Sequence, residues 1–524
     1  MRKENHFSPI IFALILIAGV LLGYSLNFSS NNNAPESNKF NLILHQLEAL
    51  YVDSLEKDAL VEKAVENLLT ELDPHSSYIP AKDLEAINEP MEGSFDGIGV
   101  KFNLKDDTIL VVAPISGGPS ERVGIRAGDK IVRVDGEVIA GTDLTNQKVF
   151  DLLRGERGSK VVLGVLRGGE KELVEFDITR GKIPIHSIDL AYMVDHELGY
   201  IKVNRFSATT YEEFKKASDE LLNKGMQKLL LDLRNNPGGY LGAAINMSNE
   251  FLDGDKLIVY TEGRSREKEE YFSNAAGRLL DTKVTILIDE GSASASEIVA
   301  GALQDNDRGT VAGRRSFGKG LVQEQFEHND GSAFRITTQR YYTPTGRCIQ
   351  KPYENGNKDS YDNDWMTRLE SGELTSKDSI YFTDSLMFVT PQGKIVYGGG
   401  GIMPDVFIPL DTNSYHPSIA KASRKDLVRS FAFDYTNQHR AELEAVSLEA
   451  FIQFFEIDTK TWNALAKQCA EAGVELHMIE WTMEDRKIIN TQLKAFIARN
   501  IWNDAGFYPV IHQIDETFQE AIRL

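Results

Sequence analysis

The chain has 524 residues, of which 42% are hydrophobic and 26% are charged, with a formal net charge of −21 at pH 7. This length is too great for a single hydrophobic core, and the composition is that of a globular protein with several domains. It excludes a disordered, collagen-like or multi-span membrane chain. The excess of acidic residues would repel a phosphate backbone, so we expect no nucleic-acid partner.

Cysteine and histidine usage excludes several kinds of site. The chain has only two cysteines, Cys348 and Cys469, which are too few for a disulfide framework or a cysteine zinc site. Its ten histidines include no HExxH spacing, which is the main signature of a metalloprotease. We therefore expect neither a metal nor a cofactor.

Residues 1–38 have the pattern of a targeting segment. Arg2 and Lys3 precede an apolar run at residues 10–26, and the polar linker Asn27–Asn38 follows. The run is at the lower length limit for crossing a bilayer, and basic residues before such a run keep that end in the cytoplasm. We expect an uncleaved membrane anchor with the rest of the chain exported to the periplasmic side; a cleaved signal peptide is the alternative.

Residues 39–90 are expected to form a helical N-terminal region. Apolar residues recur at helical spacing from Phe40 towards Asn88. The pattern stops at Leu72-Asp73-Pro74, because the residue before a proline is disfavoured in the α region.

Residues 91–182 change to short β segments separated by glycines. The expected elements are strands at Gly97–Phe102, Ile109–Ala113, Lys160–Arg167 and Glu172–Ile178, a last hairpin turn at Arg167-Gly168-Gly169, and a helix at Leu144–Leu153 capped by Thr142 or Asp143. This order resembles a PDZ domain. The specific part of the match is the run Gly-Ile-Arg-Ala-Gly-Asp-Lys-Ile that begins at Gly124, with Val-Asp-Gly after it.

The PDZ resemblance implies a peptide-binding loop. A PDZ domain binds an extended peptide as an added strand and holds its terminal carboxylate with successive backbone N–H groups. The residues that match this loop are Gly97, Ile98, Gly99 and Val100. Glycines let the backbone approach an anion closely. Shaping a tight strand entry is the alternative role of these glycines.

Residues 183–410 contain two strand–turn–helix units. Buried strands at Lys228–Leu233 and Val284–Ile288 run into the turns Arg234–Gly239 and Gly291–Glu297, and a helix follows each turn. Such units indicate β-α-β crossovers in a mainly parallel sheet, whose sites lie at the carboxyl ends of the strands. Each turn also presents backbone N–H groups near a helix N-terminus.

Two segments of this region carry candidate catalytic side chains. The Ser-Ala-Ser-Ala-Ser run at residues 292–296 is, taken alone, more typical of a helix N-cap than of a nucleophile. Lys319 is flanked by glycines, and Gln323 lies four residues on, so the two side chains share a face. A lysine kept neutral by burial accepts a proton from a serine. A lysine whose stem packs along a hairpin fits the pattern equally well.

The motifs together resemble those of carboxy-terminal processing peptidases, which are tail-specific serine proteases with a PDZ domain ahead of the catalytic core. The matching segments are Leu72–Tyr78, the PDZ run, Asp232–Gly239, Ser292–Glu297, Gly318–Gly320, Tyr341–Arg347 and Gly400–Asp405. The resemblance extends from about Phe40 to Pro409.

The family resemblance implies a role for each of these positions. It makes Ser294 the nucleophile, Lys319 the general base and Gln323 the residue that orients Lys319. The implied oxyanion donors are the backbone N–H of Ala295 and that of either Gly238 or Gly239. It implies no serine–histidine–aspartate triad. We therefore expect structural roles for His75, Ser292, Ser296 and, as a helix-start carboxylate, Glu297.

Two segments carry no motif of this family. Residues 411–524 have a helical texture and are expected to pack on the core or to form a dimer contact. The polar, acidic stretch Lys351–Ser385 is interpreted as an excursion from the serine peptidase domain at residues 183–410.

The expected fold is multidomain α/β, with a helical N-terminal segment, a PDZ-like β domain, a mainly parallel β-α-β catalytic core and a helical C-terminal extension. The expected function is a Ser–Lys endopeptidase that recognises apolar C-termini of exported proteins and cleaves near their tails. The alternative is a membrane-tethered PDZ scaffold with an inactive core. A homodimer and an adaptor protein both stay open as partners.

Overall fold

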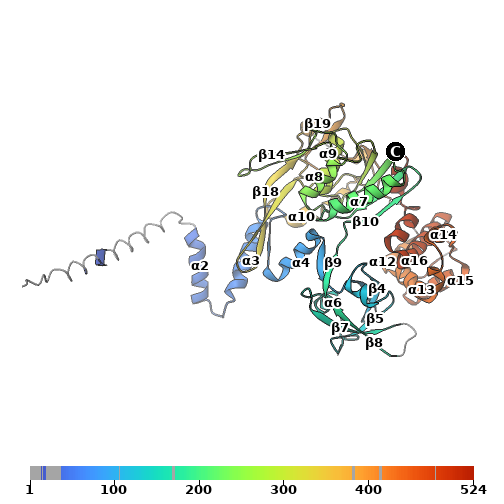
Figure 1. The fold of residues 1–524 in the computed structure, drawn as a ribbon. Helices are drawn as coiled ribbons and strands as arrows, with labels where there is room; N and C mark the ends of the chain where they lie inside the picture. Colours follow the sequence, from blue (N-terminus) through green and yellow to red (C-terminus); the bar gives the residue numbers. More distant parts are fainter. Residues whose placement is uncertain are drawn as a thin grey trace, which may run out of the picture. The chain divides into compact units, whose positions relative to one another are not determined.

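The computed structural model describes residues 13, 16–18, 37–105, 107–167, 172–380, 384–411, 416–477 and 479–524. It separates into two compact units, one up to Glu71 and one from Leu72 to Leu524 (Figure 1). Within the described ranges, no helix has the length and apolarity needed to span a membrane. The apolar run at residues 10–26 lies almost entirely outside these ranges, so the anchor and the export of the chain stay predictions.

The first unit consists of helices, as expected. Helix α2 spans Ser37–Leu50 and α3 spans Lys57–Thr70. Lys57 at the start of α3 pairs with Glu48 of α2 at 3.1 Å.

The next segment is not entirely helical. Strand β1, Ser77–Ile79, precedes helix α4, Ala81–Glu92. Asp73 accepts hydrogen bonds from the His75 and Ser76 N–H groups, and this turn directs β1 to pair with a distant strand. A three-residue strand is too short for any periodicity to reveal.

Residues 94–184 form the β unit that resembles a PDZ domain. Its elements are β2 Ser94–Gly97, β3 Val100–Lys105, β4 Thr108–Pro114, α5 Pro119–Val123, β5 Lys130–Val134, β6 Glu137–Val138, α6 Asn146–Leu153, β7 Lys160–Leu166, β8 Val174–Thr179 and β9 Gly181–Pro184. The main sheet has the order β3-β4-β5-β7-β8, with β6 beside β5. Its core consists of fully buried aliphatic residues such as Ile109, Ile131, Leu163 and Ile178.

Two details of this unit differ from expectation or lie outside the described residues. The cap of α6 is Thr145, not Thr142 or Asp143, because extended Thr145 accepts from the Lys148 N–H. The predicted turn at residues 167–169 falls largely on residues 168–171, which the structure does not describe.

The catalytic-core candidate is built on a six-stranded sheet. Its strands, in spatial order, are β10 Ile188–Met193, β11 Leu198–Val203, β12 Lys228–Asp232, β15 Lys283–Ile288, β16 Thr310–Gly313 and β21 Val406–Phe407. All neighbours are parallel except β10 and β11. The mainly parallel sheet predicted from the two strand–turn–helix units is therefore correct.

Alternate residues of the buried strands face opposite sides of this sheet. Leu229 and Leu231 pack with helices α7 (Thr210–Asn223), α8 (Leu241–Asn249) and α9 (Ala295–Asp305). Leu230 packs on the other face with Phe518 of α17, Glu516–Ala521. A segment of the C-terminal extension thus covers the catalytic sheet.

A second, antiparallel sheet lies beside this core. It has the order β1-β18-β13-β14, with β17 paired to β18. Its other strands are β13 Leu257–Glu262, β14 Glu269–Phe272, β17 Leu321–Glu327 and β18 Ala333–Tyr342. A turn at Asn329–Gly331 joins β17 to β18, with Gly331 at a φ of 85°.

The acidic excursion contains short elements of its own. They are α10 Lys358–Asp362, α11 Asp364–Glu370 and η1 Lys377–Ser379. The end of the excursion overlaps η2 Asp384–Leu386, and the hairpin strands β19 Met387–Val389 and β20 Ile395–Tyr397 follow it.

The C-terminal extension is helical, as expected, and it has its own core. Its helices before α17 are α12 Pro417–Arg424, α13 Leu427–Glu444, α14 Leu448–Phe454, α15 Thr459–Glu471 and α16 Met483–Ile511. They bury a cluster that includes Leu465, Ile489, Leu493 and Ile497. Lys105 of the PDZ-like unit pairs with Asp434 of α13 at 2.7 Å, so this extension is also in contact with that unit.

Candidate active site

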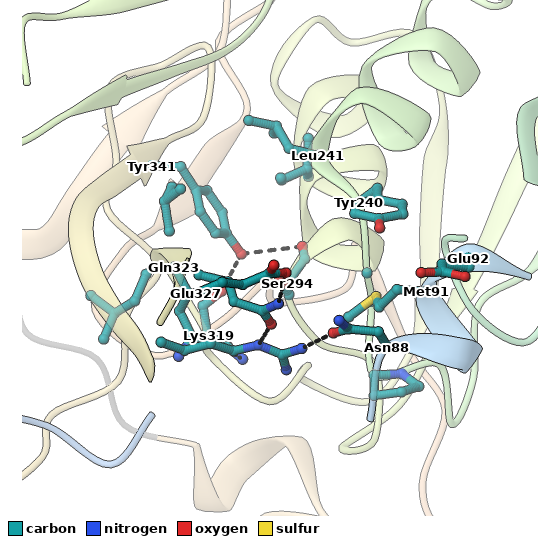
Figure 2. Close-up of a pocket in the computed structure, with 18 residues that line it drawn as sticks. Asn88, Met91, Glu92, Tyr240, Leu241, Ser294, Lys319, Gln323, Glu327 and Tyr341 are labelled. Atoms are coloured by element: carbon teal, nitrogen blue, oxygen red, sulfur yellow. Dashed lines mark hydrogen bonds between the residues drawn. The ribbon is translucent and has the colours of Figure 1, made fainter. Parts of the chain in front are cut away.

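A cavity of about 740 Å³ lies where the glycine loop after β12, the start of α9 and the β17–β18 hairpin meet (Figure 2). Helix α4 forms another wall. The lining residues are Asn88, Met91, Glu92, Pro237, Gly238, Gly239, Tyr240, Leu241, Ser294, Ile298, Lys319, Leu321, Val322, Gln323, Gln325, Glu327, Arg335 and Tyr341. The structure therefore brings Ser294, Lys319, Gln323 and both candidate glycines to one cavity.

Ser294 occupies a strained turn at the start of α9. It is the N-cap residue, and its φ of 55° lies in the left-handed region that non-glycine residues rarely adopt. The glycine loop lies directly against it, because a Cβ on Gly238 would be 2.7 Å from the Ser294 Cβ. A Cβ on Gly239 would overlap the Phe206 carbonyl oxygen. Only glycines allow this close packing.

The backbone donors around Ser294 differ in availability. The Gly238 N–H donates to the Asn236 Oδ1 at 2.9 Å. Among the described residues, the N–H groups of Gly239 and Ala295 have no acceptor. Two donors next to Ser294 are thus free to bind an oxygen atom of a ligand.

Lys319 lies in the segment that leads into β17. Its Nζ donates to the Gln323 Oε1 at 3.1 Å, and a bulge between Val322 and Gln323 marks this point of the hairpin. Burial lowers the pKa of Lys319 below its ordinary value, and the positive charge of Arg335 lowers it further. In the part of the chain that is described, no hydrogen bond joins the Lys319 Nζ to the Ser294 Oγ.

His75 holds Gln323 in its orientation. The Gln323 Nε2 donates to the His75 carbonyl oxygen at 2.5 Å, which leaves the Oε1 free to face Lys319. The His75 ring nitrogen Nε2 contacts the Tyr361 hydroxyl at 3.1 Å. Burial and the charge of Lys319 lower the pKa of His75 to about 3, so the ring is neutral at neutral pH.

The start of the acidic excursion also contributes to the site, although the excursion contains no motif that indicates this. The Lys351 N–H donates to the Gly318 carbonyl at 2.9 Å, and the Gly320 N–H donates to the Gln350 Oε1 at 2.8 Å. Lys351 at the start of the excursion and Gln350 just before it thus fix the two neighbours of Lys319. The excursion's only sequence signal was its proximity to the Tyr341–Arg347 motif.

Glu297 is more than a helix-start carboxylate. It is fully buried, and its Oε2 accepts from the backbone N–H groups of Ser294 at 2.8 Å and Lys319 at 2.9 Å. Its Oε1 accepts from the Gly318 N–H at 2.7 Å and from the Ser316 hydroxyl at 2.5 Å. Burial raises the pKa of Glu297 to about 7, against these hydrogen bonds, which favour the ionised form.

The other serines of the run make packing contacts, in agreement with their expected roles. The Ser292 hydroxyl donates to the Leu233 carbonyl at 2.8 Å, and the Ser296 hydroxyl donates to the Asn236 carbonyl at 2.9 Å. Both bonds tie the start of α9 to the glycine loop. Across the described ranges, no group of three His, Cys, Asp or Glu residues could hold a metal ion.

The candidate peptide-binding loop lies outside this cavity. Gly99 has a φ of 76°, and its carbonyl accepts from the Ile115 N–H. The Ile98 carbonyl accepts from the Ser120 N–H and hydroxyl. Judged on the residues that are described, the N–H groups of Ile98 and Gly99 have no acceptor. Val100 begins β3, and Gly97 ends β2.

Comparison with known proteins identifies the family. The model of peptidase family S41 matches residues 197–356, and the PDZ domain model matches residues 97–178. A probable CtpA-like serine protease of Staphylococcus aureus (strain bovine RF122 / ET3-1) is 35% identical over 356 residues, which cover 66% of this chain and 71% of the relative. The chain belongs to peptidase family S41.

Other relatives agree with this assignment. A carboxy-terminal-processing protease of Bartonella bacilliformis is 36% identical over 350 residues, which cover 64% of this chain and 80% of the relative. The chain is therefore a serine protease of the C-terminal processing kind, with a PDZ domain and an S41 catalytic domain.

Solved structures and a third family model complete the comparison. The photosystem II D1 C-terminal processing protease is 27% identical and covers 71% of this chain and 86% of its own, with a TM-score of 0.37. The peptide-bound PDZ domain of a Vibrio cholerae carboxy-terminal protease is 30% identical and covers 17% of this chain and 97% of its own, with a TM-score of 0.16. Residues 419–503 match a family of unknown function, DUF8443.

The contacts of Glu297 predict a severe effect for Glu297→Gln in this S41 peptidase. Glutamine offers one acceptor oxygen where the carboxylate offers two, so two of the four donors would face an NH₂ group. Each stranded donor costs about 1–3 kcal/mol. We expect proteolysis to fall at least about 100-fold and the melting temperature to drop.

The matched control is Glu290→Gln, since Glu290 pairs with Arg314 at 2.7 Å and does not line the cavity. It should change proteolysis less than about twofold. An active and stable Glu297→Gln protein would contradict the role given to this carboxylate.

Proposed function

We propose that this S41 peptidase is an endopeptidase with a Ser294–Lys319 dyad, which binds substrate C-termini through its PDZ domain and cleaves exported proteins near their tails. The observation that carries the proposal is the placement of a strained serine and an enclosed lysine in one cavity, beside two free backbone donors. Strained backbone and a lysine pKa lowered by burial are both typical of catalytic sites.

Lys319 acts as the general base. Because burial and Arg335 disfavour its ammonium form, its neutral amine accepts the Ser294 hydroxyl proton as the Oγ attacks the scissile carbonyl carbon. In the resting arrangement Nζ faces Gln323. The mechanism requires the Ser294 hydroxyl and the Lys319 amine to come within hydrogen-bond reach when substrate binds. Gln323, held by the His75 carbonyl, keeps the amine directed into the cavity.

Ala295 and Gly239 supply the oxyanion donors. Both N–H groups lack an acceptor among the described residues, whereas the Gly238 N–H already binds Asn236. Because its N–H is not already bonded, Gly239 is favoured over Gly238 as the second oxyanion donor. The two donors stabilise the negative oxygen of the tetrahedral intermediate. Lys319, now protonated, then gives its proton to the leaving amine, and water releases the acyl group from Ser294 by the same steps in reverse order.

The PDZ domain selects the substrate by its free C-terminus. The N–H groups of Ile98 and Gly99, which have no acceptor among the described residues, can hold a carboxylate, and β3 offers an edge to which a peptide strand can add. The ring centroids of Phe102 on β3 and Phe150 on α6 are 5.7 Å apart, so the surface between β3 and α6 is apolar. Apolar C-terminal residues therefore fit it best.

Family membership disfavours the alternative of an inactive scaffold. A scaffold would need only the PDZ loop, and it would gain nothing from enclosing a lysine beside a strained serine. Proteolytic activity of the purified protein distinguishes the two functions directly.

The first prediction for the dyad is that Ser294→Ala and Lys319→Ala each reduce proteolysis by about 10⁴-fold, since nucleophile and base act as a unit. The double variant should be little slower than either single one. Melting temperatures should stay within a few degrees of the wild type. The matched controls are Ser265→Ala and Lys268→Ala, which alter exposed residues between β13 and β14 and should retain activity. Substantial turnover by Ser294→Ala or Lys319→Ala would contradict the dyad.

The second prediction concerns pH. The base form of Lys319 is the neutral amine, so kcat/KM should rise with pH through a pKa below the ordinary lysine value of about 10.4. Glu297 has a pKa of about 7, and its carboxylate form holds the site together. Its deprotonation should therefore also raise kcat/KM with pH, at lower pH than that of Lys319. Lys319→Arg should be inactive at every pH, because a guanidinium does not deprotonate. A profile that is flat from pH 5 to 9 would falsify the role of Lys319 as base.

The third prediction concerns substrate selection. Amidating the C-terminus of an unstructured substrate with an apolar tail removes the anion that the Ile98 and Gly99 donors would bind. We expect kcat/KM to fall about tenfold or more, because charge-assisted hydrogen bonds are lost while the scissile bond is unchanged. The measurement compares matched acid and amide substrates. Equal rates would remove C-terminal recognition from the proposal and leave the peptidase assignment in place.

A further inference from the structure

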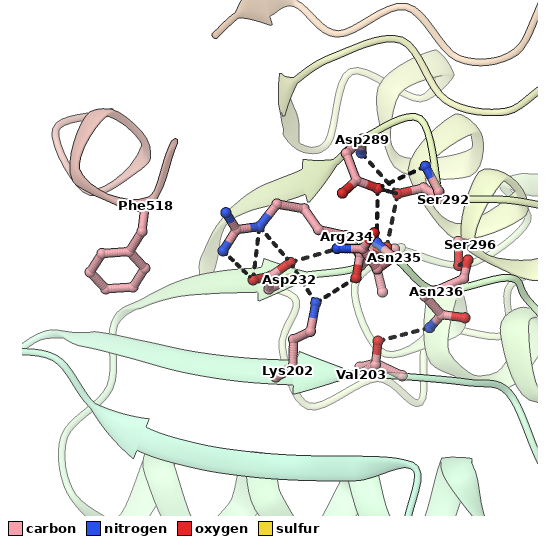
Figure 3. A network of polar contacts seen from close by, with 12 residues as sticks. Lys202, Val203, Asp232, Arg234, Asn235, Asn236, Asp289, Ser292, Ser296 and Phe518 are labelled. Carbon is pink, nitrogen blue, oxygen red and sulfur yellow. Dashed lines mark hydrogen bonds and ion pairs between the residues drawn. The ribbon is translucent and has the colours of Figure 1, made fainter. Parts of the chain in front are cut away.

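The glycine loop of the active site begins at a cluster of four charged side chains, of which Figure 3 shows Asp232, Arg234 and Lys202. Asp232 is fully buried, and its carboxylate binds the Arg234 Nη2 at 2.7 Å and the Lys202 Nζ at 3.2 Å. On the other side of Arg234, its Nη1 binds the Asp515 Oδ2 at 2.9 Å. The cluster thus holds two cations, Lys202 and Arg234, and two anions, Asp232 and Asp515. The negative charge of Asp515 makes the number of anions equal to the number of cations.

Asp515 comes from the C-terminal extension and not from the S41 segment. It is the N-cap residue of α17, where its Oδ1 accepts from the Phe518 N–H at 3.0 Å. His512 stacks on Phe518 with ring centroids 3.9 Å apart, and it meets Tyr200 edge-on at 4.8 Å. The Tyr200 hydroxyl in turn donates to Asp232 at 2.8 Å. The extension therefore contacts the cluster both by charge and through Tyr200.

The cluster is continuous with the backbone of the glycine loop. The Arg234 N–H donates to the Asp232 Oδ1 at 2.9 Å, and the Arg234 carbonyl accepts from the Lys202 Nζ at 2.5 Å. Two residues on, the Asn236 side chain bonds the Val203 carbonyl and the Gly238 N–H. A displacement of Arg234 is thus passed along a short, hydrogen-bonded loop to Gly239.

We propose that Asp515 is a positioning residue for the oxyanion donor of Gly239, which it holds in place by neutralising Arg234. The inference rests on the proposed function, because it requires the loop to supply that donor. Without the Asp515 carboxylate, Lys202 and Arg234 share Asp232 as their only anion in the cluster. The Arg234 side chain then shifts together with its backbone. A misplacement of about 1 Å at such a donor costs roughly 100-fold in rate.

The test is Asp515→Asn in the full-length protein. Asparagine keeps the size of the side chain and the oxygen that caps α17, and it removes the charge opposite Arg234. We expect kcat to fall about tenfold with KM changed less than about twofold, because an oxyanion contact is made in the transition state and not in the bound substrate. Asp515→Glu restores the charge and should retain kcat within about threefold.

Two further variants separate positioning from packing. Phe518→Leu loosens the same helix without altering charge, so it should lower the melting temperature and leave kcat within about twofold. Arg234→Lys keeps a cation that cannot bridge Asp232 and Asp515 together, so it should lower kcat about tenfold. Adding Asp515→Asn to Arg234→Lys should then cost much less than a further tenfold, because both act through one contact.

An unchanged kcat in Asp515→Asn overturns the inference, as does a loss in kcat that Phe518→Leu reproduces. Additive effects of Arg234→Lys and Asp515→Asn overturn it as well. If Asp515→Asn does not fold, the kcat and KM of Arg234→Lys decide, with unchanged kcat counting against the inference. Failure of the proposed function is recognised separately, as proteolysis that persists in Ser294→Ala.

Discussion

One buried carboxylate joins the two halves of this active site. One oxygen of Glu297 accepts hydrogen bonds from the backbone N–H groups of both Ser294 and Lys319, so the Ser294 turn and the Lys319 segment are held by the same carboxylate. The two segments come from different sheets, since α9 follows the parallel sheet and Lys319 leads into the antiparallel hairpin. The Tyr341 hydroxyl joins the same two residues a second time, because it contacts the carbonyl oxygens of both Ser294 and Lys319. Burial in this position disfavours the charged carboxylate, and this raises the pKa of Glu297.

Other contacts hold the Lys319 segment and the Ser294 turn separately. Lys351 of the acidic excursion, Gln350 just before it and His75 hold the Lys319 side, through Gly318, Gly320 and Gln323. The glycine loop holds the Ser294 side, and its first residues depend on an ion cluster that includes a residue of the C-terminal extension. Segments distant in sequence thus converge on the two N–H groups of the proposed oxyanion site. Such a site loses rate for small displacements, which explains why it is supported from so many directions.

The parts of the structure that could be predicted from sequence are those with local physical signals. The buried strands, the glycine turns after them and the serine at the helix start follow from hydrophobic runs and from residues that permit unusual backbone angles. The choice between Gly238 and Gly239 required an account of which N–H is already bonded. The role of Glu297 could not be predicted, because two of its donors come from residues 21 and 22 positions away. Asp515 is 281 positions from Arg234, and no local pattern links them.

The most direct test of the dyad is to treat the protein with a serine-reactive fluorophosphonate and to locate the adduct by peptide mass spectrometry. The reagent forms a bond to a serine only where a base removes the hydroxyl proton and donors stabilise the phosphoryl oxygen. A single adduct on Ser294, which disappears in Lys319→Ala protein of unchanged fold, is the predicted result. An adduct on Ser292 or Ser296, or labelling of Ser294 at the same rate without Lys319, would contradict the account.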